Sequence, residues 1–111
     1  MVPTVHASVL ALVTSPREFD RKQVRVVGYV VSQLEVWAVF NCEVDCRSGV
    51  TNNAVWLETY GTSYERVNQT YAIVEGTFDA SSHGHLGMWS GTIRNITRLE
   101  QVSAEPSERL T

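Results

Sequence analysis

The run from Tyr71 to Ala80 is the sequence feature that most limits the fold, because small or apolar residues alternate with polar ones along it. Successive side chains of a β-strand point to opposite faces of a sheet, so this alternation predicts a strand with one buried face. Such a strand needs partners for its backbone groups, which predicts a sheet. The face expected to be buried consists of every second residue: Ala72, Val74, Gly76, Phe78 and Ala80.

Four further segments rich in β-branched and aromatic residues, at 23–31, 34–40, 54–60 and 92–102, are also predicted strands. Gly28 in the middle of the first indicates a bulge or a sharp bend. A bulge near Asn95 would restore the alternation that the last segment loses. Five strands in about a hundred residues predict a mainly β fold, a five-stranded OB-like β-barrel. An SH3-like barrel or a small sandwich is the alternative.

The N-terminal third is predicted to be partly helical. Val5, Val9 and Val13 have helical spacing, which predicts a short amphipathic helix over residues 5–14. The segment from Ser15 to Glu18 has a capping-box pattern and predicts one further turn, with a core-facing phenylalanine after it. Residues 41–53 are polar and are expected to form a loop. We therefore expect one OB-like domain over residues 1–102 and a flexible tail over 103–111.

The bulk composition narrows the function. The 111 residues carry a net charge of −3 with only nine Lys and Arg, which argues against a strongly electrostatic nucleic-acid binder. No run reaches the roughly 18 apolar residues that a membrane span needs. The N-terminus has no Lys or Arg before its apolar run and so makes a poor signal peptide. The compartment stays open: periplasmic if a leader has been removed, and otherwise cytoplasmic.

Two blocks, residues 53–57 (NAVWL) and 75–99, resemble a family of small, mostly uncharacterised bacterial proteins with an OB-like barrel. The resemblance extends over about residues 9–100. It implies an OB-like fold and a bacterial origin, and it brings no catalytic residues with it. The family often has glycine where this chain has Arg21, and the pair Cys42 and Cys46 is not a feature of the family.

The aromatic residues are the strongest lead to a binding site. Trp37 and Trp56 on neighbouring strands would form a platform if both faced outward, as in OB-type barrels that stack bases, sugars or partner side chains. Of these two, Trp56 is the better core candidate and Trp37 the better surface candidate. The glycine-rich connection at 81–91 would flank that face. The predicted ligand-binding residues are Trp37, Trp56, Tyr60, His83, His85 and Trp89.

The sequence predicts no metal, cofactor or catalytic site. The pair His83 and His85 has two of the ligands a metal needs and no evident third, so a polar turn anchored by His85 is expected. The glycines lack the spacing of a phosphate-binding loop. Ser90 is not in a nucleophile elbow. Cys42 and Cys46 are three residues apart and leave three alternatives: a disulfide, two reduced thiols, or a redox or metal role.

We therefore expect a binding module rather than an enzyme, with a protein or a small molecule as its ligand. Glu35, Glu43 and Asp45 surround the Trp37 region, which disfavours nucleic acid. A single-stranded nucleic-acid-binding OB domain is the alternative, and it requires the basic residues to converge on one face. A self-associating structural domain is the third possibility, and the oligomeric state is left open. The residues needed by the nucleic-acid alternative are Arg17, Lys22, Arg25 and Arg94.

Overall fold

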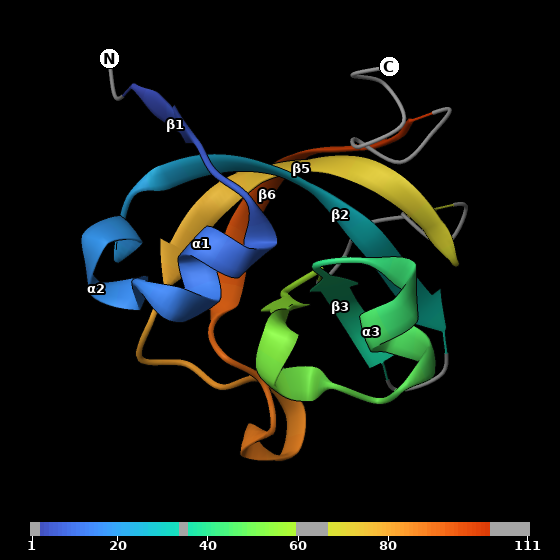
Figure 1. Ribbon diagram of the computed structural model, residues 1–111. Helices are drawn as coiled ribbons and strands as arrows, with labels where there is room; N and C mark the ends of the chain where they lie inside the picture. The colour runs from blue at the N-terminus through green and yellow to red at the C-terminus, as the bar shows by residue number, and fades with distance from the viewer. Residues whose placement is uncertain (1–2, 34–35, 60–66, 103–111) are drawn as a thin grey trace.

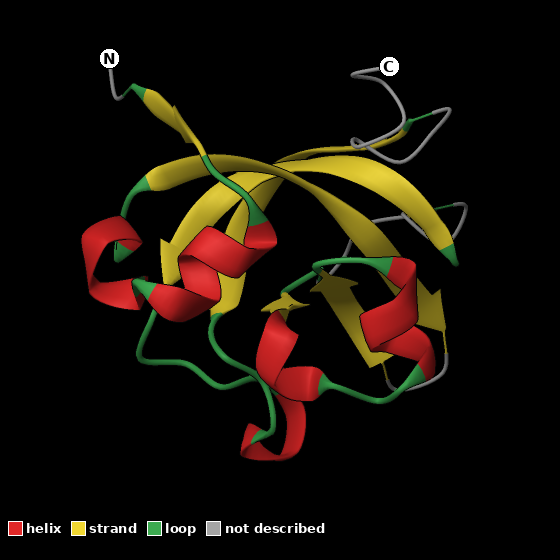
Figure 2. Ribbon diagram, in the orientation of Figure 1, coloured by secondary structure: helices red, strands yellow, loops and turns green. Residues whose placement is uncertain are grey.

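The structure, a computed structural model, describes residues 3–33, 36–59 and 67–102 (Figure 1). Most of these residues lie in strands, with short helices packed around them (Figure 2). The strands are β1 (Thr4–His6), β2 (Gln23–Gln33), β3 (Val36–Phe40), β4 (Ala54–Leu57), β5 (Thr70–Asp79) and β6 (Thr92–Gln101). The helical segments are α1 (Val9–Thr14), α2 (Pro16–Phe19), α3 (Glu43–Arg47) and the 3-10 turns η1 (Thr51–Asn53) and η2 (His85–Gly87).

Five of the strands form a closed ring of hydrogen-bonded neighbours. Its order is β2-β3-β4-β6-β5, and β5 pairs with β2 again to close it. All of these pairs are antiparallel except β4–β6, which is parallel. The short β1 adds a parallel pairing to the start of β2. The mainly β fold predicted from the sequence is therefore confirmed.

The long strand β2 connects the two halves of this ring, and Figure 1 shows it as a curved ribbon. Its register with β5 runs through Gly28 without a shift, so the predicted bulge is absent there. Gly28 is needed instead for a close approach: a Cβ at this position would lie 2.6 Å from the carbonyl oxygen of Phe40. The expected bulge near Asn95 is confirmed, because the β5–β6 register shifts between Glu75 and Thr77 and Asn95 has φ of +50°.

The main core lies inside the ring. The predicted inner face of β5 is buried at Ala72, Val74 and Phe78. Helix α1 closes one side of the ring, because Val9 and Leu12 are fully buried within the same cluster. A second, smaller cluster lies apart from the main core and consists of Val31, Ala38, Phe40, Ala54 and Trp89.

The predicted helix over residues 5–14 was too long at its N-terminal end. Residues 4–6 pair with β2 instead, and the helix begins after Ser8, whose hydroxyl accepts a hydrogen bond from the amide of Ala11 at 2.9 Å. This side chain satisfies an amide that the first helical turn leaves without a partner, which sets the start of α1. The turn after Ser15 forms as predicted in α2, although the serine makes no side-chain capping bond.

The predicted loop over residues 41–53 contains the helical segments α3 and η1. Helix α3 has two acidic residues in its first turn and Arg47 in its last, an arrangement that the helix dipole favours. Arg47 also contacts Glu43 at 2.5 Å, one helical turn away. A polar composition alone did not distinguish this helix from a loop. The longest α-helix described has six residues, and no helix in the described ranges could cross a membrane.

Candidate functional site

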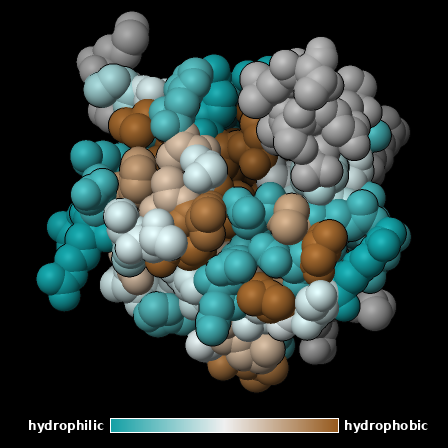
Figure 3. All heavy atoms as spheres, viewed as in Figure 1, coloured by the Kyte–Doolittle hydropathy of each residue, from teal (hydrophilic) through white to brown (hydrophobic). Residues whose placement is uncertain are grey.

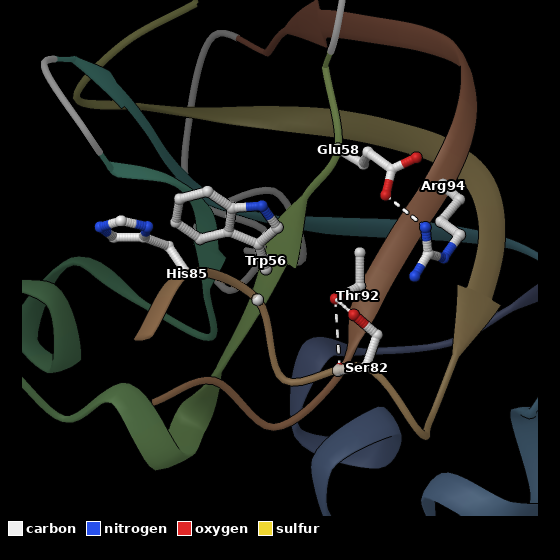
Figure 4. Close-up of a pocket in the computed structure, with 7 residues that line it drawn as sticks. Trp56, Glu58, Ser82, His85, Thr92 and Arg94 are labelled. Atoms are coloured by element: carbon white, nitrogen blue, oxygen red, sulfur yellow. Dashed lines mark hydrogen bonds and ion pairs between the residues drawn. The ribbon is translucent and has the colours of Figure 1, made fainter. Parts of the chain in front are cut away.

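A pocket of about 510 Å³ lies where the connection from β5 to β6 passes over β4 (Figure 4). Three segments distant in the sequence meet here: β4 with the residue after it, the 82–85 part of the connection, and the start of β6. The lining residues are Trp56, Glu58, Ser82, Gly84, His85, Thr92 and Arg94.

The parallel pairing of β4 and β6 brings the two sides of the pocket together. Trp56 is the register partner of Thr92, and the amide of Glu58 donates to the carbonyl of Ile93 at 3.0 Å. Residues 56 and 58 alternate with buried Leu57 and so share one face, as do residues 92 and 94 around Ile93. Strand geometry therefore places Trp56 and Glu58 on one side of the pocket, opposite Thr92 and Arg94.

Glycine is required at position 84 for the connection to pass this close to β4. Gly84 has φ of +64°, a conformation that costs other residues free energy. A Cβ on it would lie 2.5 Å from the Cβ of Trp56 and 2.8 Å from Cδ1 of Trp89. Gly84 thus allows the connection to lie directly against Trp56 and Trp89.

Hydrogen bonds then hold the connection in place. Nδ1 of His83 lies 2.9 Å from the carbonyl oxygen of Trp89, so this nitrogen carries the proton and donates it. The indole N–H of Trp89 donates to the carbonyl of His85 at 3.1 Å. The amide of Ser90 donates to the carbonyl of Ala54 at 3.1 Å, which ties the connection to β4. His83 thus anchors the connection, and His85 contributes through its carbonyl group.

Stacked aromatic rings form one wall of the pocket. The rings of Trp56 and His85 are stacked, with centroids 5.9 Å apart and an angle of 29° between their planes. Behind them Trp89 lies 5.5 Å from Trp56 and meets Phe40 edge-on at 5.8 Å. Trp89 is only 6% exposed, so it supports the wall from within the second cluster.

Arg94 forms the opposite side of the pocket and is shared by two carboxylates. Its Nη1 pairs with Oε2 of Glu58, and its Nε lies 3.0 Å from Oδ2 of Asp79. Hydrogen bonds from Ser81 hold the pKa of Asp79 below its ordinary value, and Arg94 lowers it further. One cation and two anions leave this side of the pocket with a net charge of −1.

Between the two walls lie two hydroxyl groups. The hydroxyl of buried Thr92 donates to the hydroxyl of Ser82 at 2.8 Å, and the Ser82 carbonyl oxygen lies 3.2 Å away as a second acceptor (Figure 4). Figure 4 shows the indole nitrogen of Trp56 on the ring edge nearer Thr92 and Glu58. Within the described residues this N–H has no hydrogen-bond partner. The pocket thus offers donors and acceptors close to an aromatic surface.

The structure brings together only part of the predicted aromatic platform. Trp56 pairs across β3–β4 with Ala38, the neighbour of Trp37, so the two tryptophans point to opposite faces of the sheet. Trp37 is half-buried and packs against the main core, so the expected exposed surface at Trp37 is wrong. Trp56 is half-buried as well, and Trp89 is the most buried tryptophan. Tyr60 lies outside the described residues.

Sequence reasoning missed five lining residues: Glu58, Ser82, Gly84, Thr92 and Arg94. The signal available was the two-residue spacing of 56 with 58 and of 92 with 94, which places each pair on one strand face. The pairing of β4 with β6 is not evident from the sequence, because all of β5 lies between them in the chain. The spacing therefore indicated two half-sites without showing that they meet.

A second pocket, of about 340 Å³, lies on the other side of Trp89 and is mostly apolar; Phe40, Cys46 and Met88 contribute to it. Cys42 and Cys46 are both free thiols, at the start of α3 and within it. Burial, and then the nearby Glu43, raise the pKa of Cys46, so its thiol stays protonated at neutral pH. Among the described residues, no three His, Cys, Asp or Glu side chains are grouped as a metal site would need.

Comparison with known proteins gives one structural relative. No family model matches the sequence, and a search of curated proteins finds no match. Among solved structures, a DUF3299 family protein from Pseudomonas aeruginosa PAO1 matches with a TM-score of 0.55 and 15% identity. The match covers 89% of this chain and 76% of that one. At this identity the likeness is one of fold, to an uncharacterised bacterial protein.

Proposed function

We propose that the protein is a binding module of OB type that holds a small polar ligand in the pocket between Trp56 and Arg94. The single observation behind this proposal is an aromatic wall facing an ion pair across a pocket of about 510 Å³. Small-molecule sites are concave, have aromatic walls and carry a few polar groups that fix orientation. A flat apolar face would have favoured a protein partner instead.

The ring topology supports an OB-type assignment. Numbered along the chain, the ring strands run 1-2-3-5-4 and then return to 1, a Greek-key arrangement of five strands. In OB-type barrels the connection between strands four and five flanks the ligand face. Here that connection is residues 80–91, and it supplies Ser82, Gly84 and His85 to the pocket. This contribution from the connection supports a ligand site at the pocket.

The hydrogen bond between the hydroxyls of Ser82 and Thr92 favours binding over catalysis. The hydroxyl of Ser82 has Thr92 as its partner, whereas a nucleophilic serine needs a base within hydrogen-bond reach. Single-stranded nucleic acid is disfavoured because Arg94 and Arg25, two of the four basic residues that this alternative requires, are paired with carboxylates. Phosphate contacts would have to compete with these pairs.

The proposal is tested by NMR on ¹⁵N-labelled protein with mixtures of small metabolites. We expect ligand-dependent shifts at the Trp56 indole N–H and at the amides of Ser82, Gly84 and Arg94. The amides of Ala7 and Ser8 line a different pocket and serve as an internal control. Shifts confined to those control amides, or none with any metabolite class at millimolar concentration, would refute the proposal.

A further inference from the structure

Resting on the proposed function, we infer that the ligand is a neutral sugar, bound with its ring against the Trp56–His85 wall and its hydroxyls toward Glu58 and Arg94. Three properties of the pocket lead to this class of ligand: its charge, its mixture of donors and acceptors, and its aromatic surface. The charge disfavours an anion, the hydrogen-bonding groups require a ligand that donates and accepts, and the aromatic surface requires a ring with an apolar face.

The charge of the pocket excludes an anionic ligand. Among the lining residues that the structure describes, Arg94 is the one arginine or lysine, and it already pairs with both Glu58 and Asp79. A phosphate or carboxylate would have to displace one of these pairs and would then face the released anion. A ligand without charge leaves both ion pairs intact.

The hydrogen-bonding groups call for a ligand that both donates and accepts. Nη2 of Arg94 and the Trp56 indole N–H can donate, and within the described chain neither has a partner. Oε1 of Glu58 can accept, and the Ser82 hydroxyl can do both. A sugar hydroxyl is both a donor and an acceptor, so adjacent hydroxyls can bridge Glu58 and Arg94.

The aromatic wall calls for a ring with an apolar face. Trp56 is half-buried and His85 is exposed, so the stacked rings leave surface open to the pocket. A pyranose has C–H groups on its faces and hydroxyls at its rim, which matches an apolar wall beside a polar one. The pocket volume lies within the range of small-ligand sites.

The test compares probes that share a ring and differ in charge. The neutral probes are the methyl glycosides of glucose, galactose, mannose and N-acetylglucosamine. The anionic probes are glucuronate and glucose 6-phosphate, and benzyl alcohol is the apolar ring control. We expect at least one neutral glycoside to shift the Trp56 indole N–H and the Ser82 amide, and to bind more tightly than either anionic probe.

Matched variants locate the interaction. In Glu58→Gln we expect about tenfold weaker binding of the neutral sugar, because a strong hydrogen bond to a carboxylate becomes a weaker one to a neutral amide oxygen. The preference for the neutral sugar over glucuronate should also narrow, because the variant removes a negative charge. Glu75→Gln is the matched control, because Glu75 also pairs with arginine side chains but does not line the pocket. The affinity of this variant for the neutral sugar should stay within about twofold of that of the wild type. Trp56→Phe keeps a ring and loses the N–H, and should retain weakened binding.

The outcomes separate this inference from the proposed function. Tighter binding of glucuronate, glucose 6-phosphate or benzyl alcohol at the same residues would overturn the sugar assignment and leave the small-ligand site standing. Equal losses in Glu58→Gln and Glu75→Gln would overturn the assigned contact with Glu58. If no neutral glycoside shifts the pocket residues, the sugar inference fails, and the broader metabolite screen decides the proposed function independently.

Discussion

At the scale of single residues, backbone conformation and close contact decide which positions tolerate change. Gly84 and Gly87 lie in the same connection with nearly the same φ, +64° and +67°. They differ in surroundings: a Cβ at Gly84 would meet Trp56, whereas nothing lies within 4 Å of one at Gly87. A side chain at position 84 therefore meets a steric cost that one at position 87 does not.

Gly84→Ala is expected to lower the free energy of unfolding by about 2–4 kcal/mol, which combines left-handed strain with overpacking against Trp56. Gly87→Ala should cost only about 1–2 kcal/mol, because strain alone applies there. Urea unfolding of both variants measures the difference. Equal losses would mean that Trp56 moves aside without penalty, contrary to the close packing described.

Glu75 gives a prediction about pH. Its carboxylate lies 2.9 Å from Nη1 of Arg98 and 3.1 Å from Nε of Arg25, and these two arginines, Arg98 foremost, hold its pKa below the ordinary value against the effect of burial. A carboxyl group whose pKa is lowered in the folded state stabilises the protein at pH values above its unfolded-state pKa. This stabilisation is lost as the pH falls through the folded-state pKa. Glu75→Gln should therefore lower Tm at pH 7 and have a much smaller effect at pH 3. A Tm difference that does not change with pH would contradict this assignment.

At the scale of elements, the short helix α1 covers a side of the ring that the strands leave open. Helix α1 has only six residues, too few to be stable alone, so its stability comes from packing. Leu12 is fully buried inside the ring, whereas Leu10 on the same helix is 44% exposed. The helix thus contributes to stability mainly through one face.

Leu12→Ala is expected to cost about 2–5 kcal/mol, because it removes a buried side chain and leaves a cavity. Leu10→Ala makes the same chemical change at an exposed site and should stay within about 0.5 kcal/mol. Thermal unfolding of the two variants provides the comparison. Similar losses would show that α1 does not close the ring as described.

At the scale of the whole molecule, charge is distributed so that basic side chains face acidic ones. Arg25, Arg94 and Arg98 each pair with at least one carboxylate, and the chain carries a net charge of −3. Arg25 and Arg98 meet at Glu75, whereas Arg94 meets Glu58 and Asp79. Two of the four basic residues that the nucleic-acid alternative requires, Arg25 and Arg94, are thus paired within the protein.

A fluorescent thymidine oligonucleotide is therefore expected to show no binding, even at low salt, where phosphate contacts are strongest. Fluorescence anisotropy at 20 µM protein would measure it, with the salt concentration raised from about 20 to 200 mM as the control for electrostatic attraction. Binding that weakens steeply with salt would instead favour the single-stranded nucleic-acid alternative.

The sequence by itself determined the five strands of the ring. Alternation identified the inner face of β5, and the loss of alternation located the bulge at Asn95. These features depend on local geometry, which has a fixed period of two residues in strands. Where composition was the only guide, as in residues 41–53, a short helix was missed.

Only the tertiary structure shows that the two residue pairs, 56 with 58 and 92 with 94, meet in one pocket. The pairing of β4 with β6 joins Trp56 and Glu58 to Thr92 and Arg94 across more than thirty residues of sequence. The alternation of side chains along a strand puts Trp37 and Trp56 on opposite faces of the sheet. The sequence favoured Trp56 for the core, whereas it is Trp37 that packs against the main core. Long-range pairing depends on how the whole ring closes, and no local pattern records it.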